Sequence, residues 1–220
     1  MSPNIETCGL ARRQNGLTLT ELCVVLVVLG LILGVIVAAV VKAGKRAKSI
    51  CCNCNLKQIG ISFKLWEFDH TNFFPMALST NLGGTREFLS TGAAFRHFQA
   101  MSNELSTPFI LVCPQDSRLR AKDFGQGFAN SNISYFVGFV ENSDNPQKLL
   151  SGDRHLTGGT RLPGGLVEFT TNDSPAWKPD LHGGFGNVAL ADGSVQGFST
   201  KGLRTALINT GAATNRLAMP

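Results

Sequence analysis

The longest hydrophobic segment of the chain begins at Leu22 and ends at Val41, with neither a charged residue nor a proline among its 20 residues. At about 1.5 Å per residue, a helix over this segment is about 30 Å long, which matches the hydrocarbon core of a bilayer. A polar segment containing Arg12 and Arg13 precedes it. A secretory signal peptide has a shorter apolar core of about 7–15 residues and a small-residue cleavage site after it. The pattern therefore predicts a retained transmembrane helix.

Beyond Val41, apolar positions recur with a period close to that of an α-helix, and Lys and Gln residues lie between them. These positions are Ile50, Cys54, Ile59, Phe63 and Trp66. They predict an amphipathic continuation of the same helix over residues 42–70, to about Asp69. The segment Asn72-Phe73-Phe74-Pro75 should end it, because the residue before a proline is disfavoured in a helix.

Residues 71–220 have the mixed pattern of a globular α+β domain. Spaced apolar residues predict one or two short helices between Thr85 and Leu105, and β-branched and aromatic runs predict strands at Pro108–Val112 and Ile133–Val140. Residues 141–166 are rich in Asn, Ser, Asp, Gly and Pro, which predicts a long loop.

The clearest local signal in this domain is a hairpin from Gly186 to Phe198, with Asp192-Gly193 in a type I′ turn. Thr200 is expected to cap a last helix, and the segment after Gly211 is expected to be loose. The expected fold is α+β: a long N-terminal helix, transmembrane in its first half and amphipathic in its second, packed on a small antiparallel β-sheet domain with long loops.

Glu21 is unusual because it places a carboxylate at the start of the apolar segment. Burying an unpaired ion there costs several kcal/mol, so the group should be partnered or neutral. Cleavage after Gly16 would create an amino group at Leu17, one helical turn from Glu21, and in an assembly the carboxylate could pair with a neighbour's terminus. Alternatively, Glu21 extends to the lipid headgroups.

Gly30 and Gly34 form a Gly-x-x-x-Gly pattern that lets helices approach closely, although glycine is also simply common in membrane helices. We favour packing between helices here.

The start of the chain resembles the class III signal of type IV prepilins and pseudopilins: a basic leader ending in Gly, then a hydrophobic residue, then Glu at the fifth position of the apolar helix. The resemblance implies a leader over residues 1–16, cleavage after Gly16 by a prepilin peptidase, N-methylation of Leu17 and a transmembrane helix over residues 17–41. It also implies that Glu21 guides assembly into a filament. Leu17 stands where Phe is commoner, and Ala38 or Ala39 stands where many pilins have a proline.

A second pattern is similar to a large prepilin-like family that carries a Cys-x-x-Asn-Leu-Lys-Gln helix and ends in a His, nine residues, then Asp-Gly. The matching residues are Asn55, Leu56, Lys57, Gln58, His182, Asp192 and Gly193. Three further blocks resemble the family's middle: Cys113-Pro114-Gln115-Asp116, Ser134-Tyr135-Phe136 and Gly152-Asp153-Arg154. The resemblance covers residues 12–200, with the signature at 182–193, and implies a pseudopilin-like role.

The net charge of +5 suggests a nucleic-acid partner, but its distribution argues for another. Residues 42–64 hold six basic and no acidic residues, whereas residues 65–220 hold 12 basic and 13 acidic ones. Basic residues just beyond a membrane helix favour lipid headgroups or neighbouring subunits over DNA. The same residues would place the domain in the cytoplasm by the positive-inside rule, whereas the prepilin resemblance implies the periplasmic or extracellular side of the inner membrane. We follow the resemblance.

Two candidate metal or catalytic groups are present. His182 with Asp192 could form a metal or catalytic pair, but a structural role is favoured because Asp192 suits a turn and His182 can hydrogen-bond the following Gly-Gly loop. Asp173, Asp180 and Asp192 are weak calcium candidates, since their spacing matches no calcium loop. The chain carries no enzyme signature, so a non-enzymatic protein without a cofactor is expected.

Four cysteines, Cys51, Cys52, Cys54 and Cys113, lie beyond the apolar segment, where an oxidising exterior would favour disulfides. Cys51-x-x-Cys54 lies within the expected helix and lacks both the following His of a haem site and the second Cys pair of a zinc site. A structural disulfide from this helix, through Cys51 or Cys54, to Cys113 is our hypothesis. An anchored thiol oxidoreductase is disfavoured, because a redox thiol normally lies at a helix N-terminus.

Together these patterns predict a structural subunit, a pseudopilin or minor pilin of a type II secretion or type IV pilus-like filament. Its partners would be a prepilin peptidase, other pilin subunits and membrane lipid. The alternative is a membrane-anchored module that binds polysaccharide, secreted cargo or DNA.

Overall fold

The computed structural model describes Gly16 and residues 18–220, which fall into two compact units that divide between Lys45 and Arg46. The expected leader up to residue 15, and Leu17, lie outside the described residues. The second unit carries the domain, and the helix α1 contributes to both units.

Helix α1, Leu19–Asp69, runs for 51 residues and ends where the sequence predicts. Its N-terminus is a capping box: the Thr18 backbone N–H donates to Glu21 Oε2 at 2.8 Å, and the Glu21 N–H donates to Thr18 Oγ1 at 3.3 Å. From Leu22 to Val41 its large apolar side chains are exposed. Within the described residues, α1 is the one helix long and apolar enough to cross a membrane.

The second half of α1 has one buried face, formed by residues three and four apart. These residues are Cys52, Leu56, Ile59, Phe63 and Trp66. Two expected members, Ile50 and Cys54, are exposed instead, because the stripe through Cys52 leaves them on other sides of the helix.

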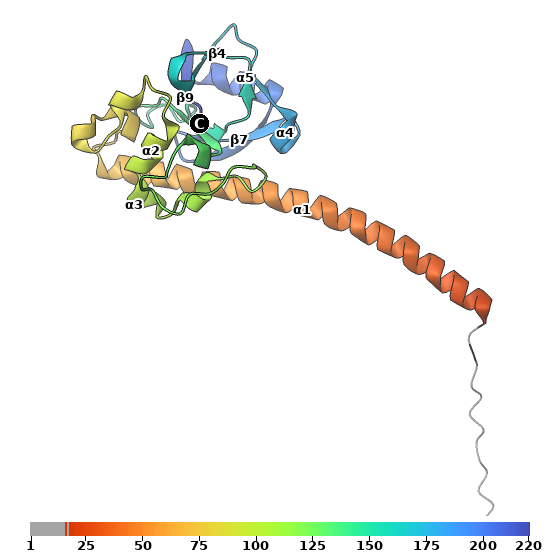
Figure 1. Ribbon diagram of the computed structural model, residues 1–220. Helices are drawn as coiled ribbons and strands as arrows, with labels where there is room; N and C mark the ends of the chain where they lie inside the picture. Colours follow the sequence, from red (N-terminus) through yellow and green to blue (C-terminus); the bar gives the residue numbers. More distant parts are fainter. Residues whose placement is uncertain (1–15, 17) are drawn as a thin grey trace, which may run out of the picture. The chain divides into compact units, whose positions relative to one another are not determined.

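Short helices lie beside this part of α1, as Figure 1 shows. They include α2 (Ala94–Ala100) and α3 (Ser102–Leu105), and the Phe98 ring lies 6.1 Å from the Phe63 ring. Short 3-10 turns complete this side: η1 (Pro75–Ala77), η2 (Thr80–Leu82), η3 (Arg86–Phe88), η4 (Pro108–Leu111) and η5 (Asn130–Asn132). The two predicted helices between Thr85 and Leu105 are thus confirmed.

The domain is built on a seven-stranded, fully antiparallel sheet in the order β4-β5-β9-β1-β2-β7-β8. Its strands are β1 (Tyr135–Gly138), β2 (Leu149–Asp153), β4 (Thr160–Arg161), β5 (Leu166–Thr170), β7 (Phe185–Leu190), β8 (Val195–Ser199) and β9 (Thr214–Ala218). A second sheet pairs β3 (Leu156–Thr157) with β6 (Ala176–Trp177). The remaining elements are η6 (Pro163–Gly165), α4 (Pro179–His182) and α5 (Thr200–Asn209).

Helices cover both faces of the large sheet (Figure 1). Side chains alternate along β1, so Tyr135 and Val137 join the core that contains α1, whereas Phe136 joins a second core on the opposite face. Leu203 and Leu207 of α5 close that second core. The fold is therefore α+β, with a long N-terminal helix and an antiparallel sheet, as predicted.

The β7–β8 hairpin forms at the predicted place, but its turn is not type I′. That turn needs positive φ at both central residues, and only Gly193 has it, at 83°. The Gly193 N–H donates to the Leu190 carbonyl at 2.9 Å, and Asp192 Oδ1 accepts the Ser194 N–H at 2.8 Å. The loop is a wider turn with glycine at the left-handed position. Ser199, not Thr200, caps α5, because its hydroxyl accepts the Gly202 N–H.

Three further predictions of local structure are wrong. Residues 108–111 form the 3-10 turn η4, in which the Thr107 hydroxyl accepts the Phe109 N–H. The predicted loop at 141–166 contains β2, β3 and β4, and the predicted loose tail contains β9. These strands are short or polar, and tertiary pairing rather than local propensity holds them.

Candidate functional site

Four potential ligand side chains from four separate segments converge where α1 meets the domain. Cys52 comes from α1, Cys113 follows η4, Asp153 ends β2 and His182 ends α4. One ligand atom from each lies within 4.8 Å of all the others, and among the described residues this is the only such group of three or more. The side chains are 0 to 4 % exposed. We call it the four-residue cluster.

Short contacts link the members of the cluster. The Cys52 thiol donates to Asp153 Oδ1 at 3.3 Å, and His182 Nε2 lies 3.4 Å from Asp153 Oδ2. Cys113 Sγ lies 3.6 Å from His182 Nε2, and Tyr135 Oη lies 3.2 Å from Cys52 Sγ. Both sulfur atoms, the carboxylate and one imidazole nitrogen therefore face a common point.

The sheet fixes Asp153. Antiparallel pairing sets Asp153 opposite Tyr135 in the β1–β2 register. From the neighbouring strand β7, the Asn187 backbone N–H and side-chain Nδ2 donate to Asp153 Oδ2 at 2.7 and 3.1 Å. Because backbone pairing holds the strands on both sides of β2, the carboxylate has little freedom to turn away.

Two turns position the other domain ligands. Helix α4 ends at His182 because Gly183 takes a left-handed conformation, with φ of 65°, that terminates the helix. Cys113 precedes Pro114, and the Gln115 backbone N–H donates to the Cys113 sulfur. Both side chains are thereby directed at α1.

Proton affinities in the cluster are strongly shifted. Burial lowers the pKa of His182, but the Asp153 carboxylate and the Cys113 sulfur outweigh it and raise that pKa to about 10. The contact with Cys52, together with His182, outweighs burial and lowers the pKa of Cys113 to about 6. The same contact with Cys113, followed by burial, raises the pKa of Cys52. The contacts among these residues therefore favour the charged form of His182 and the thiolate form of Cys113.

A second polar network continues from the cluster. Arg154 holds Asp116 with two hydrogen bonds of 2.8 and 3.0 Å, and His155 Nδ1 lies 2.7 Å from Asp180 Oδ1. Burial raises the pKa of Asp116, but His155 and Arg154 outweigh it and hold that pKa well below its usual range. These residues lie one to three positions from cluster members in the sequence, so the network stabilises the segments that carry the cluster.

The structure separates the residues that the sequence suggested as metal or calcium ligands. His182 faces Asp153 rather than Asp192, which lies in the β7–β8 turn. Asp180 is paired with His155, and Asp173 Oδ2 accepts both the N–H and the hydroxyl of Thr170.

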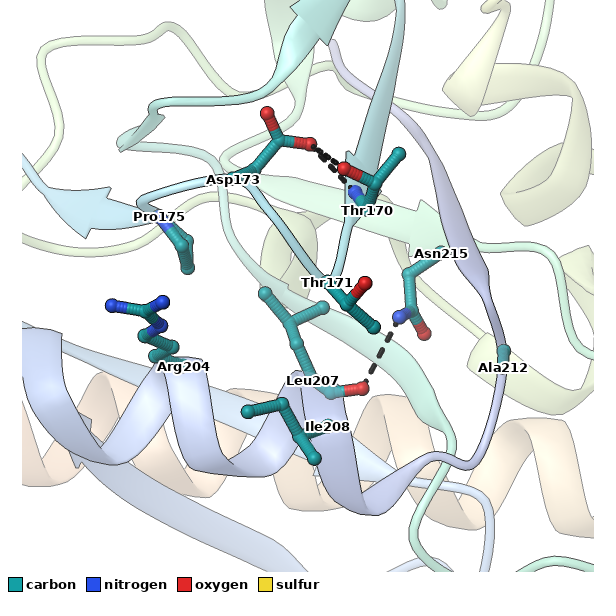
Figure 2. Close-up of a pocket in the computed structure, with 9 residues that line it drawn as sticks. All are labelled: Thr170, Thr171, Asp173, Pro175, Arg204, Leu207, Ile208, Ala212 and Asn215. Atoms are coloured by element: carbon teal, nitrogen blue, oxygen red, sulfur yellow. Dashed lines mark hydrogen bonds between the residues drawn. The ribbon is translucent and has the colours of Figure 1, made fainter.

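Figure 2 shows Asp173 at the edge of a small pocket between its turn and α5. The volume of this pocket is about 10 Å³, which is room for a single water molecule. Asn215 crosses it with a hydrogen bond of 3.3 Å to the Leu207 carbonyl. The pocket is therefore a packing feature rather than a substrate site.

The cysteines differ from the expectation. Cys51 and Cys54 are exposed, Cys113 is buried, and all five described cysteines are free thiols. The helix cysteine beside Cys113 is Cys52. Two signals in the sequence indicate Cys52 rather than Cys51 or Cys54. Cys52 begins the Cys-x-x-Asn spacing that ends at Asn55, and it lies on the buried stripe of α1.

The Asp-Gly end of the sequence signature also contacts α1. A Cβ on Gly60 would lie 3.3 Å from the Gly193 carbonyl oxygen, a tight contact, so the glycine at position 60 favours the close approach of the turn to the helix. Asn55 Nδ2 donates to the Val112 carbonyl at 3.3 Å, which ties α1 to the segment carrying Cys113. Leu56 is buried in the core, whereas Lys57 and Gln58 are exposed.

In the apolar first half of α1, a Cβ on Gly30 or Gly34 would have nothing within 4 Å, and Gly16 is exposed.

Comparisons of the chain with protein-family models, curated proteins and solved structures found no match. The functional argument therefore rests on the residues themselves.

Proposed function

We propose that the chain is a subunit of a type IV pilin-like filament, a pseudopilin or minor pilin, anchored in the inner membrane and processed after Gly16. The observation that carries this proposal is α1: its first half is apolar, exposed and long enough to span a bilayer, while its second half supplies a buried stripe to the domain core. A filament subunit needs both properties in one helix, one for assembly and one to carry the domain. The protein acts by assembly rather than by catalysis.

The start of α1 supports the same function. Glu21 lies five residues after Gly16, and within one chain its carboxylate accepts hydrogen bonds from the N–H and hydroxyl of Thr18. In the filament, Glu21 exchanges this local capping for the amino terminus of a neighbouring subunit, released when the leader is cut. Gly30 and Gly34 provide a face without side chains for the neighbouring helix.

Intact mass of the full chain co-expressed with a prepilin peptidase tests the processing step. The expected product has the mass of residues 17–220 plus one methyl group, and a Gly16→Ala variant stays uncut. An uncut wild-type chain, beside a known prepilin that the same peptidase does cut, would contradict the proposal.

Assembly is tested separately with a Glu21→Ala variant in cells that carry the filament machinery. The variant should be processed and inserted in the membrane, yet it should be missing from the sheared filament fraction that contains wild type. Filaments with normal amounts of the variant would instead favour a plain anchor that displays a binding module.

A further inference from the structure

We propose that Cys52, Cys113, Asp153 and His182 bind one Zn²⁺ ion in a closed tetrahedral site that fastens α1 to the domain. The proposal concerns the ligand of the four-residue cluster and does not depend on processing or assembly.

The spacing of the ligand atoms matches a tetrahedral ion. Zinc bonds of about 2.3 Å to sulfur and about 2.0–2.1 Å to nitrogen or oxygen place neighbouring tetrahedral ligands about 3.3–3.8 Å apart. The observed separations are 3.3 Å for Cys52 Sγ to Asp153 Oδ1, 3.6 Å for Cys113 Sγ to His182 Nε2, and 3.4 Å for His182 Nε2 to Asp153 Oδ2. Three residue pairs therefore make contacts at zinc spacing; the two Asp153 contacts are made by different oxygens of its carboxylate, one of which would bind the ion.

The donor set selects the metal. Two thiolates and an imidazole suit zinc, whereas calcium and magnesium take oxygen ligands almost exclusively. Four protein ligands complete the coordination and all four side chains are buried, so no position stays open for water or substrate. Such closed sites are structural rather than catalytic.

The ligand types also suit a cation. Cysteines bind zinc as thiolates, so Zn²⁺ would displace the thiol protons and lie among two sulfur atoms, a carboxylate and an imidazole in a buried setting.

Neighbouring groups orient the ligands in the way that metal sites require. Asn187 donates two hydrogen bonds to the Asp153 carboxylate, and Tyr135 Oη lies 3.2 Å from the Cys52 sulfur. The Gln115 backbone N–H donates to the Cys113 sulfur. Partners of this kind fix ligand geometry and tune affinity.

A disulfide between Cys52 and Cys113 is the competing chemistry. It would use the two sulfur atoms alone and would leave Asp153 and His182 without a reason to face them. The convergence of all four groups, each from a different segment, is what a metal ion explains. The ion would join residues up to 130 positions apart in sequence.

The test uses the full chain, purified in detergent with reductant, stripped of metal with a chelator and dialysed against Zn²⁺ or Co²⁺. We expect one Zn²⁺ per chain by elemental analysis, and thiolate-to-cobalt charge-transfer absorption with the visible bands of tetrahedral Co²⁺. Cys52→Ser should weaken Zn²⁺ binding at least about tenfold and abolish the charge-transfer signal of one thiolate. Cys51→Ser, one residue away and exposed, is the matched control and should bind like wild type.

A wild-type measurement covers the case in which Cys52→Ser does not fold. Zn²⁺ should raise the unfolding midpoint of the stripped chain in a concentration-dependent way, equally for wild type and Cys51→Ser. The proposal is overturned if the reduced wild-type chain takes up neither metal, if Cys52→Ser binds as wild type does, or if Zn²⁺ leaves the midpoint unchanged. A Cys52–Cys113 disulfide in chain isolated without reductant, free of zinc, would also overturn it.

Discussion

The buried His97 should make the domain lose stability in mild acid. This residue lies in α2 with no exposed surface, and its Nδ1 lies 2.7 Å from the Thr85 hydroxyl oxygen. Burial lowers the pKa of His97 from 6.5 to about 4. The folded domain therefore keeps this imidazole neutral at pH values where the unfolded chain protonates it.

The size of the effect follows from the two pKa values. Between pH 6.5 and about 4 the unfolded state binds the extra proton, so the free energy of unfolding falls as the pH falls through this window. The contribution is fully present above 6.5 and is lost as the pH reaches the folded pKa. The gap of about 2.5 corresponds to about 3 kcal/mol, with a slope of at most about 1.4 kcal/mol per pH unit.

Urea unfolding of the detergent-solubilised chain, followed by tryptophan fluorescence, measures this effect. Both tryptophans of the chain, Trp66 and Trp177, are buried in the domain, so the signal reports on its unfolding. The variant His97→Gln keeps a polar partner for Thr85 and cannot titrate. Its free energy of unfolding should fall less steeply than that of wild type between about pH 6.5 and pH 4. Carboxylates titrate in both chains and cancel in the difference, so parallel curves would refute the reasoning.

Four substitutions in the same urea assay test the packing and the capping of α5. Phe63→Ala, at a fully buried position of α1, should lower the free energy of unfolding by about 3–5 kcal/mol. Phe68→Ala, at a position 81 % exposed, should change it by less than about 0.5 kcal/mol. Equal effects of the two substitutions would contradict the assigned stripe. Gly60→Val should cost about 1–3 kcal/mol, because its Cβ alone would lie 3.3 Å from the Gly193 carbonyl oxygen, and a neutral result would mean that the turn does not seat there. Ser199→Ala should cost about 1 kcal/mol by removing the cap of α5, and no loss would assign the cap elsewhere.

Local patterns predict α1 and the β7–β8 hairpin because their signals are contained in short stretches of sequence. The apolar run needs no partner to be recognised, and the helical stripe through Phe63 and Trp66 repeats every three to four residues. The Asp192-Gly193 pair marks a turn by its own backbone preferences, although the exact turn type depends on the φ of Asp192, which the sequence does not reveal.

The four-residue cluster could not be predicted from local sequence patterns. Its members are 29 to 61 positions from the next one along the chain, and the tertiary packing of α4 against the sheet brings His182 to face Asp153. Proximity within the signature suggested Asp192 as the partner of His182 instead. Each member lies in or beside one of the sequence motifs described above, but a motif alone does not indicate which other motif it contacts in the folded domain. That information arises from tertiary pairing.

Strands that depend on pairing with neighbouring strands are not predicted from the sequence, for the same reason. The polar residues of β9 have little strand propensity, but five residue pairs join β9 to β5, and it also pairs with β1. Leu217 and Ala218 are buried between the two cores, while Thr214 and Asn215 lie nearer the surface. The context, rather than the segment, makes this a strand.

The place of β9 in the sheet imposes an order of events on biosynthesis. Residues 214–218 are made after all the other strands of this sheet, yet they form an interior strand between β5 and β1. At about 5–20 residues per second, synthesis delivers the apolar part of α1 about ten seconds or more before this strand. The sheet cannot close around an absent strand, so the apolar segment has left the ribosome well before the domain can complete its fold. Loss of residues 214–218 would leave a sheet divided between β5 and β1 rather than a shorter version of the same domain.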